Sequence, residues 1–573
     1  MTDSLNHLET HVNQVLQDWH VPGMAIGVVQ NDEIILNAGF GLRDMEQNLP
    51  VTPDTVFGIA SVSKAFTTFA MALLVERGQL DWDRPVREYI PWFRLQDPAA
   101  SVGITPRDLV CHRSGLPRHD RAWYQSGANR EEVVRRLADL PPNKAFRSYY
   151  QYQNMMFVTA GYLLEQVTGE SWESFVQREI FDKLGMTRSN FSVETMQSMQ
   201  NIALPYAYLD EDTRRIPFAN VDALGPAGSI NATTTDMLNW VRLHLNQGTF
   251  DDQRLIAADG LEECHRYQTA IKETFPDCLV SYPELGPRAY GLGWFLRHYR
   301  GRRMVYHSGG IDGYGSYLAM LPKEKIGVII LSNLDEGNAP VPVTYDIFDR
   351  LLDIEPPNWS KRYLTHEGKA EQASKTRSEK LKSEIIPNTQ PSHPLQDYLG
   401  TYHHPGYGSL KVEAVQRSED ADAPICYEAH FNLIGLTLKH VHYDTFEAAS
   451  PFGAWTRLTF LSDEDGRISA VCASTEANVP PMVFERMVEA PTPEALKSCA
   501  GAYHLDGGQE VLLILSPSGQ LNLQLPEQSP LDLKPVSEDT FQTIGYPRIK
   551  ITLLKNSSIE ILHPNGLFVA ERK

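Results

Sequence analysis

Strand-forming residues in the N-terminal part of this chain fall into two groups that lie far apart in the sequence. Apolar and β-branched residues dominate 24–38, and the same pattern returns in short runs between 290 and 331. Most segments between the two groups have helical periodicity, such as 61–77 and 155–168, each followed by glycine. We therefore expect an α+β fold, in which both groups build one antiparallel sheet flanked by helices with a helical insertion.

The composition changes after Pro356. Residues 361–384 are charged and nearly free of apolar side chains, which is typical of a solvated helix or linker. Beyond them Gly400-Thr-Tyr-His403 recurs as Gly501-Ala-Tyr-His504, and each copy leads through alternating segments to a similar closing strand, which predicts two related antiparallel lipocalin-like β-barrels. The predicted units are a catalytic domain over 1–355, a charged linker over 356–393, and barrels over 394–488 and 489–573.

Composition excludes several classes of partner. The chain has 573 residues, with 52 Lys and Arg against 72 Asp and Glu, and its net charge of −20 disfavours nucleic acid and anionic lipid. No apolar run reaches the roughly 18 residues of a membrane span. No basic residue precedes Arg43, so the basic region that begins a secretory signal is not expected here. The six cysteines form no C-x-x-C pair. We expect a soluble cytoplasmic protein with reduced cysteines.

Ser61 and Lys64 carry the first candidate chemistry. Ser61 falls where a helix is expected to begin, and Lys64 follows three residues later on the same helical face. A serine becomes a nucleophile at neutral pH only when a base takes its proton. A lysine can act as that base only if burial and nearby positive charge lower its pKa from about 10.4. The apolar flanks at 57–60 and 66–74 favour such burial.

Two later segments supply polar groups that suit a substrate amide. In Tyr152-Gln-Asn154, a tyrosine near a lysine can relay a proton, and the asparagine amide can both donate and accept hydrogen bonds. In His307-Ser308-Gly309-Gly310, at the end of a predicted strand, the glycines let a substrate backbone lie along the strand edge and leave an N–H to face an oxyanion. Packed aromatic side chains are the alternative interpretation of the segment around Tyr152.

In this order, the three segments resemble those of penicillin-binding proteins, class C β-lactamases and related serine hydrolases. The resemblance implies a β-lactamase/transpeptidase-like fold and a covalent acyl-enzyme. It implies that Ser61 is the acylated nucleophile, that Lys64 is its general base and that Tyr152 relays the proton to the leaving group. It also implies that Asn154 binds the substrate amide and that the N–H groups of Ser61 and Gly310 form an oxyanion hole.

His307 departs from the Lys-Thr-Gly of many β-lactamases. His-x-Gly resembles the D-aminopeptidases and D-amino-acid amidases of the family, whose three-domain layout also includes two C-terminal barrels. The resemblance implies a small amide, a short peptide bearing a D-residue, or an ester as substrate. Two alternatives stay open: a promiscuous esterase with weak β-lactamase activity, and a protein that binds penicillin or muropeptides without turnover. The sequence also leaves open whether the chain forms a homo-oligomer.

Histidines outside these segments lack the partners of a metal site. His403-His404 and His440-Val-His442 have partial ligand spacing without Cys, Asp or Glu in a matching pattern, so we expect no metal and no cofactor.

We expect the barrels to restrict access to the site and to take no part in bond breaking. The loops 404–408 and 450–455 are the candidates for an aromatic tip at the mouth of the cleft, and ordinary barrel turns are the alternative interpretation.

Overall fold

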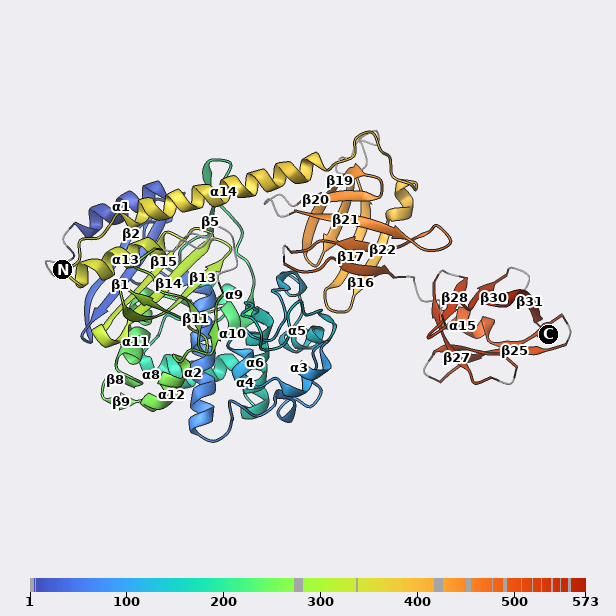
Figure 1. The fold of residues 1–573 in the computed structure, drawn as a ribbon, viewed down its shortest axis with the longest axis horizontal. Coiled ribbons are helices and arrows are strands. Elements are labelled where there is room, and N and C mark those ends of the chain that lie inside the picture. The colour runs from blue at the N-terminus through green and yellow to red at the C-terminus, as the bar shows by residue number, and fades with distance from the viewer. Residues whose placement is uncertain are drawn as a thin grey trace.

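The computed structural model describes residues 5, 7–272, 282–335, 338–416, 426–449, 455–476, 478–487, 492–506, 508–517, 519–526, 528–536, 539–546, 548–554 and 558–572. One antiparallel sheet of nine strands organises the N-terminal part, in the order β10-β11-β12-β13-β14-β15-β1-β2-β3 (Figure 1). Its strands are β1 (Gly23–Gln30), β2 (Glu33–Asp44), β3 (Leu49–Pro50), β10 (Thr269–Ala270), β11 (Ala289–Tyr290), β12 (Phe295–Tyr299), β13 (Arg302–Ile311), β14 (Tyr314–Leu321) and β15 (Ile326–Ser332).

The sheet joins the two strand groups that the sequence separates. β1 pairs with β15 over seven residues, from Met24 opposite Ser332 to Gln30 opposite Ile326. Alternate residues of β1 enter different cores, since Met24, Ile26 and Val28 belong to one cluster and Ala25 and Val29 to the other. The predicted α+β sheet assembled from both ends of the domain is therefore confirmed.

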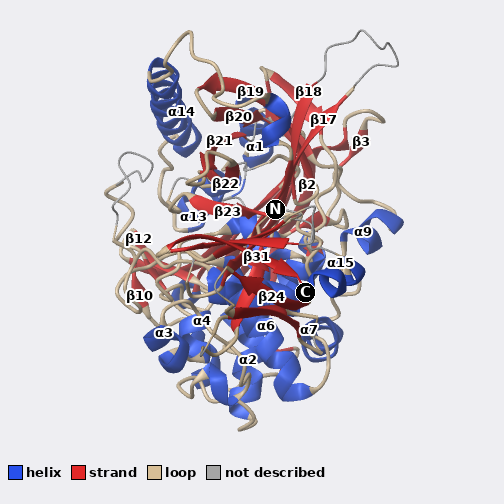
Figure 2. Ribbon diagram, turned by 90° about the vertical axis from the view of Figure 1, so that its right-hand side faces the viewer, coloured by secondary structure: helices blue, strands red, loops and turns tan. Residues whose placement is uncertain are grey.

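Helices cover both faces of the sheet. The helices α1 (Leu8–Asp18) and α13 (Pro340–Leu351) pack on the face that carries Met24, together with the start of α14 (Trp359–Ser383). On the other face lie α2 (Ser63–Glu76), α6 (Asn154–Thr168), α7 (Trp172–Val176) and α11 (Thr234–Leu245). Figure 2 shows α2, α6 and α7 gathered on one side of the molecule. In α2 every residue from Ser63 to Leu74 is buried, so this helix runs through the interior.

Both C-terminal units are closed eight-stranded antiparallel barrels, as the internal repeat predicts. The first contains β16 (Gly400–His404), β17 (Gly408–Val415), β18 (Cys426–Phe431), β19 (Ile434–His442), β20 (Thr445–Ala449), β21 (Trp455–Ser462), β22 (Ile468–Ala473) and β23 (Met482–Arg486). The second contains β24 (Gly501–Leu505), β25 (Glu510–Leu515), β26 (Leu521–Gln524), β27 (Leu531–Pro535), β28 (Thr540–Thr543), β29 (Lys550–Leu553), β30 (Ser558–His563) and β31 (Gly566–Arg572).

The repeated tyrosines close the two barrels in the same way. Tyr402 pairs with Arg486 and Tyr503 pairs with Arg572, so the first strand meets the last one in each barrel. Each tyrosine hydroxyl donates to a carbonyl four residues upstream, at 2.9 Å from Tyr402 and 2.7 Å from Tyr503. The repeated motif thus has a structural role, which is the interpretation that the sequence favours.

Within the described residues, no helix combines the length and the apolar character needed to cross a bilayer.

Candidate active site

Ser61 lies in a tight turn that leads into α2. The turn is a 3₁₀ segment, Ala60–Val62, and Ala60 adopts a left-handed backbone conformation with φ of 47°. Ser63 fixes this geometry, because its hydroxyl donates to the Ala60 carbonyl at 2.7 Å and accepts from the Ile230 N–H at 3.2 Å. A left-handed alanine costs roughly 1 kcal/mol, so the turn is held by its surroundings and presents Ser61 at the N-terminal end of a buried helix.

Lys64 is completely buried behind Ser61. Its Nζ lies 3.0 Å from Ser61 Oγ and donates to the Ala227 carbonyl at 2.7 Å. Burial lowers the pKa of this amine well below its usual 10.5, and the charge of Arg118 lowers it further, against a smaller opposing effect of Asp120. A lowered pKa favours the neutral form of the amine, whose lone pair would lie within reach of the serine hydroxyl proton, and this is the arrangement a general base requires.

Tyr152 faces the same pair from the start of α6. Lys64 Nζ stands 4.9 Å from the centroid of the Tyr152 ring. Burial raises the pKa of the phenol above its usual 10, and this outweighs the lowering effect of its hydrogen bond to Ser61. The phenol therefore keeps its proton near neutral pH. A protonated tyrosine beside a neutral lysine suits a division of labour in which the amine accepts a proton and the phenol donates one.

Asn154 is the first residue of α6 and lines the cavity in front of Ser61. Its Nδ2 donates to Asp120 Oδ1 at 2.9 Å. The same carboxylate oxygen accepts from Trp123 Nε1 at 2.9 Å, and Arg118 pairs with the other oxygen at 2.5 Å. Because a carboxylate only accepts, Asp120 fixes which end of the Asn154 amide faces it.

His307 lies behind the cavity and does not line it. The imidazole is fully buried, with Nε2 2.8 Å from the Tyr290 hydroxyl and Nδ1 2.6 Å from the Ser308 carbonyl. Since the carbonyl only accepts, Nδ1 carries the proton and Nε2 accepts from Tyr290. Burial is the main cause that lowers the pKa of His307 to about 3. The ring is neutral and adds no positive charge to this strand.

The two glycines after His307 have different surroundings. A Cβ on Gly309 would lie 2.3 Å from both the Ile59 carbonyl oxygen and Ser316 Oγ, whereas a Cβ on Gly310 would meet nothing within 4 Å. Gly309 therefore allows β13 to pack tightly on the turn that carries Ser61. Gly310 lines the cavity together with Ser61.

Gly309→Ala is expected to destabilise the protein and to lower activity. The added methyl group forces β13 away from the Ser61 turn, with a loss of about 1 to 3 kcal/mol in the free energy of unfolding. Gly310→Ala is the matched control, because the same methyl group enters open space and leaves that free energy nearly unchanged. Urea unfolding of both variants measures the difference, and equal stabilities would contradict the tight packing of Gly309.

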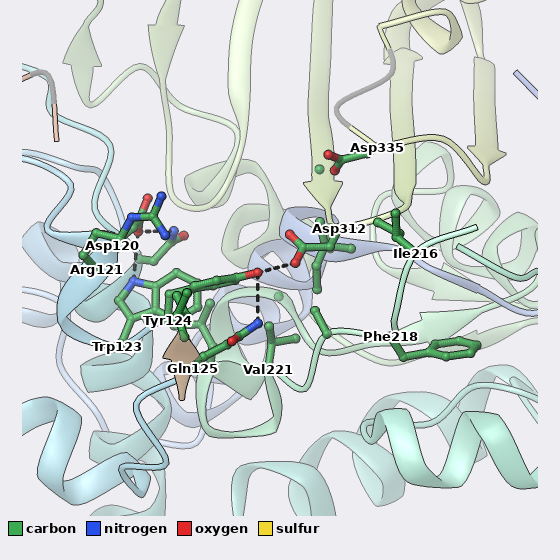
Figure 3. A pocket seen from close by; sticks show the side chains of 18 of the residues that line it. Asp120, Arg121, Trp123, Tyr124, Gln125, Ile216, Phe218, Val221, Asp312 and Asp335 are labelled. Atoms are coloured by element: carbon green, nitrogen blue, oxygen red, sulfur yellow. Dashed lines mark hydrogen bonds between the residues drawn. The ribbon is translucent and has the colours of Figure 1, made fainter. Parts of the chain in front are cut away.

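The cavity next to Ser61 has a volume of about 740 Å³. Its apolar lining includes Trp123, Leu209, Ile216, Phe218, Val221 and Ile311. Figure 3 shows Ile216 and Phe218 on one side and Asp120, Arg121 and Trp123 on the other, with Tyr124 reaching Asp312 between them. The charged lining residues are Arg118, Asp120, Arg121, Asp312, Asp335 and Glu476, so carboxylates outnumber cations.

The structure brings together Ser61, Lys64, Tyr152, Asn154 and Gly310, and it places Gly309 and His307 directly behind them. Sequence reasoning missed Arg118 and Asp120. A single Arg-x-Asp in a polar loop has no distinguishing pattern, and only the fold shows that one lowers the pKa of Lys64 and that the other holds Asn154. Among the described residues, no group of three or more His, Cys, Asp or Glu is placed to hold a metal ion.

Comparison with known proteins agrees with this geometry. The family model described as Beta-lactamase matches residues 8–347, which is more than half of the chain. The chain belongs to the beta-lactamase family. Members of this family are serine hydrolases, so the coarse chemistry of the site is that of a serine hydrolase. A second model, a domain of unknown function called DUF3471, matches residues 385–486, the region of the first barrel.

Two curated relatives of this beta-lactamase family member are fungal hydrolases. Unguisins hydrolase ungD' of Aspergillus campestris is 31% identical over 420 residues, covering 70% of this chain and 76% of the relative. Unguisins hydrolase ungD of Aspergillus violaceofuscus is 30% identical over 468 residues, covering 77% of this chain and 82% of the relative. Among solved structures, the octameric penicillin-binding protein homologue from Pyrococcus abyssi has the same fold, with a TM-score of 0.54, 22% identity, and coverage of 84% of this chain and all of that one.

Proposed function

We propose that this protein hydrolyses small amides, short peptides bearing a D-residue, or esters through an acyl-enzyme on Ser61. The observation that carries the proposal is the fully buried Lys64, whose lowered pKa places a neutral amine 3.0 Å from the Ser61 hydroxyl. A charged lysine at this position would have no proton-accepting capacity, and a serine without a base would be a weak nucleophile.

The proposed reaction proceeds in two halves. In acylation, Lys64 Nζ takes the Ser61 proton while Oγ attacks the substrate carbonyl, and the N–H groups of Ser61 and Gly310 stabilise the oxyanion. Tyr152 then donates a proton to the leaving amine or alcohol and recovers it from Lys64, so the scissile bond breaks and an ester to Ser61 remains. In deacylation, water attacks the carbonyl of that ester and gives a proton to the same pair. The bond between the acyl carbon and Ser61 Oγ then breaks, the proton passes to Oγ, and the carboxylic acid leaves.

The charges around the site favour substrates that place no free carboxylate beside His307 and the cavity lining. His307 is neutral where many β-lactamases have a lysine, and the cavity lining contains more carboxylates than cations. A negatively charged group would be repelled there, whereas an amide, an ester or a free amine would not. The rival proposal is binding of penicillin or muropeptides without turnover, and the names of the two fungal relatives, which describe hydrolases, favour turnover over it.

Intact-protein mass spectrometry tests the proposal. The protein is exposed to D- and L-aminoacyl amides, the matching esters, unguisins and penicillin, and the mass is followed with time. A transient mass increase together with product release supports turnover. A stable adduct with penicillin and no product from any other compound supports the rival proposal, and the absence of any adduct or product rejects both.

Tyr152→Phe is expected to lower kcat by about 10²- to 10³-fold and to leave KM within a few-fold of the wild type. The phenol acts as a proton donor in the proposed mechanism, and removal of such a group mainly affects the transition state. Steady-state kinetics on an amide and on an activated ester measure the effect. The loss should be larger for the amide, because its leaving group needs a proton. An unchanged kcat on the amide would make Tyr152 a packing residue.

A further inference from the structure

The first barrel reaches the cavity through the turn between β18 and β19. Leu433 of this turn and the first two residues of β19, Ile434 and Gly435, line the cavity beside Ser61, although they follow Ser61 by more than 370 residues in the sequence. The loop 404–408, one of the two loops expected at the cleft mouth, is placed differently, because Tyr407 is fully buried against His119. The other expected loop, 450–455, lies almost wholly outside the described residues.

Hydrogen bonds hold this turn on the loop that precedes α5 (Arg130–Arg136). The Leu433 N–H donates to the Gln125 carbonyl at 3.0 Å. Asn432 Nδ2 donates to the carbonyls of Arg121 and Tyr124 at 3.2 and 3.3 Å. These three hydrogen bonds to backbone carbonyls of one loop fix the position of the turn on that loop. The contact between the barrel and the catalytic domain therefore determines where Leu433 lies in the cavity.

The barrel also holds both neighbours of Asp120. The Tyr407 hydroxyl lies 2.7 Å from His119 Nδ1, and Glu476 Oε1 accepts the Arg121 N–H at 3.0 Å. Burial is the main cause of a raised pKa at Glu476, which therefore sits in a poorly solvated contact. Because Asp120 holds the Asn154 amide, the barrel supports a residue that lines the cavity.

The same loop crosses the cavity to the sheet. The Tyr124 hydroxyl donates to the carboxylate of Asp312, the residue that follows the end of β13 (Figure 3). The loop thus connects the barrel on one side with the strand edge on the other. The apolar side chains that face it across the cavity include Ile216 and Phe218.

We propose that the first barrel is a specificity-determining wall of the substrate cavity. Its β18–β19 turn selects substrates that carry a bulky apolar group beside the scissile bond, which packs between Leu433 and Ile434 on one side and Ile216 and Phe218 on the other. This inference rests on the proposed hydrolase function and names its substrate class. Leu433 is a specificity residue here, while Tyr407 and Glu476 are positioning residues that act through the loop.

Leu433→Ser and Leu433→Trp test the wall in the full-length protein. Leu433 is 76% exposed, so neither change removes a core residue. The measurement is the ratio of kcat/KM for a bulky substrate to that for a small one, taken in two series: p-nitrophenyl octanoate against acetate, and D-alanine benzylamide against D-alanine methylamide. Serine removes the apolar contact with the bulky group of the substrate, and tryptophan fills the space that this group would occupy. We expect each to lower the ratio about tenfold in at least one series.

Val483→Ser is the matched control. Val483 is an exposed apolar residue of the same barrel, 44% exposed, and is not part of the cavity lining. Its ratio should equal that of the wild type. If both Leu433 variants keep wild-type ratios in both series while the enzyme turns over, the wall is rejected and the hydrolase function stands. If the wild type hydrolyses none of these probes, both inferences are rejected.

Discussion

Ser61→Ala is expected to abolish turnover and covalent labelling together, with a loss in kcat of about 10⁴-fold or more. The change deletes the only atom that is proposed to bond to the acyl group. Ser61 Oγ is 3.0 Å from Lys64 Nζ, and the turn itself is held by the hydroxyl of Ser63, so the backbone has no reason to move. Intact mass after incubation with the best acyl donor, together with steady-state kinetics, measures both effects.

Ser198→Ala is the control for this experiment. It removes a hydroxyl from the end of α9 (Val193–Ser198), where Ser198 donates to the Thr195 carbonyl and is not among the residues that line the cavity. It should label and turn over like the wild type. If Ser61→Ala is folded by circular dichroism and is still acylated at the wild-type rate, the nucleophile is another residue and the assignment of the whole site is wrong.

The fold was largely predictable because its signals are local. The apolar and β-branched runs at 24–38 and 290–331 determine strands, and the repeat of Gly400-Thr-Tyr-His403 marks the start of each barrel. The Ser61 and Lys64 pair was predictable for the same reason, since a spacing of three on one helix brings two side chains together whatever the tertiary structure is.

The remaining parts of the site depend on contacts between distant segments. Asp120 matters because α6 places Asn154 beside it, and Leu433 matters because the first barrel docks on the loop before α5. His307 shows the same limit, because its strand position was predicted but its burial between Tyr290 and the Ser308 carbonyl was not. A turn sequence such as Asn-Leu-Ile-Gly is ordinary in any barrel, so nothing local marks it as a cavity wall.

Lys64→Arg and Lys64→Met are each expected to lower kcat/KM by about 10³-fold, within the range typical of a lost general base. Arginine keeps the charge but stays protonated, and methionine has no proton-accepting nitrogen. For the wild type, the acid limb of the profile of kcat/KM against pH should fall well below pH 10.5, because burial lowers the pKa of Lys64. An acid limb near 10.5, or an arginine variant with near-normal rates, would reject Lys64 as the base.

Lys64→Met should stabilise the fold although it removes activity. Folding buries the Lys64 amine at the expense of its proton, whereas the unfolded chain keeps that proton up to about pH 10.5. The cost to wild-type stability is therefore fully present below the folded pKa of Lys64, decreases as the pH rises through the window between the two pKa values, and vanishes above 10.5. Methionine fills the same buried space without this cost but leaves the Ala227 carbonyl without its donor, so we expect a net gain of about 1 kcal/mol in the free energy of unfolding near neutral pH.

Urea unfolding of both proteins at several pH values measures this gain in the free energy of unfolding, which should shrink as the pH approaches 10.5. A stability difference that is independent of pH would mean that Lys64 is charged in the folded protein and cannot accept the Ser61 proton.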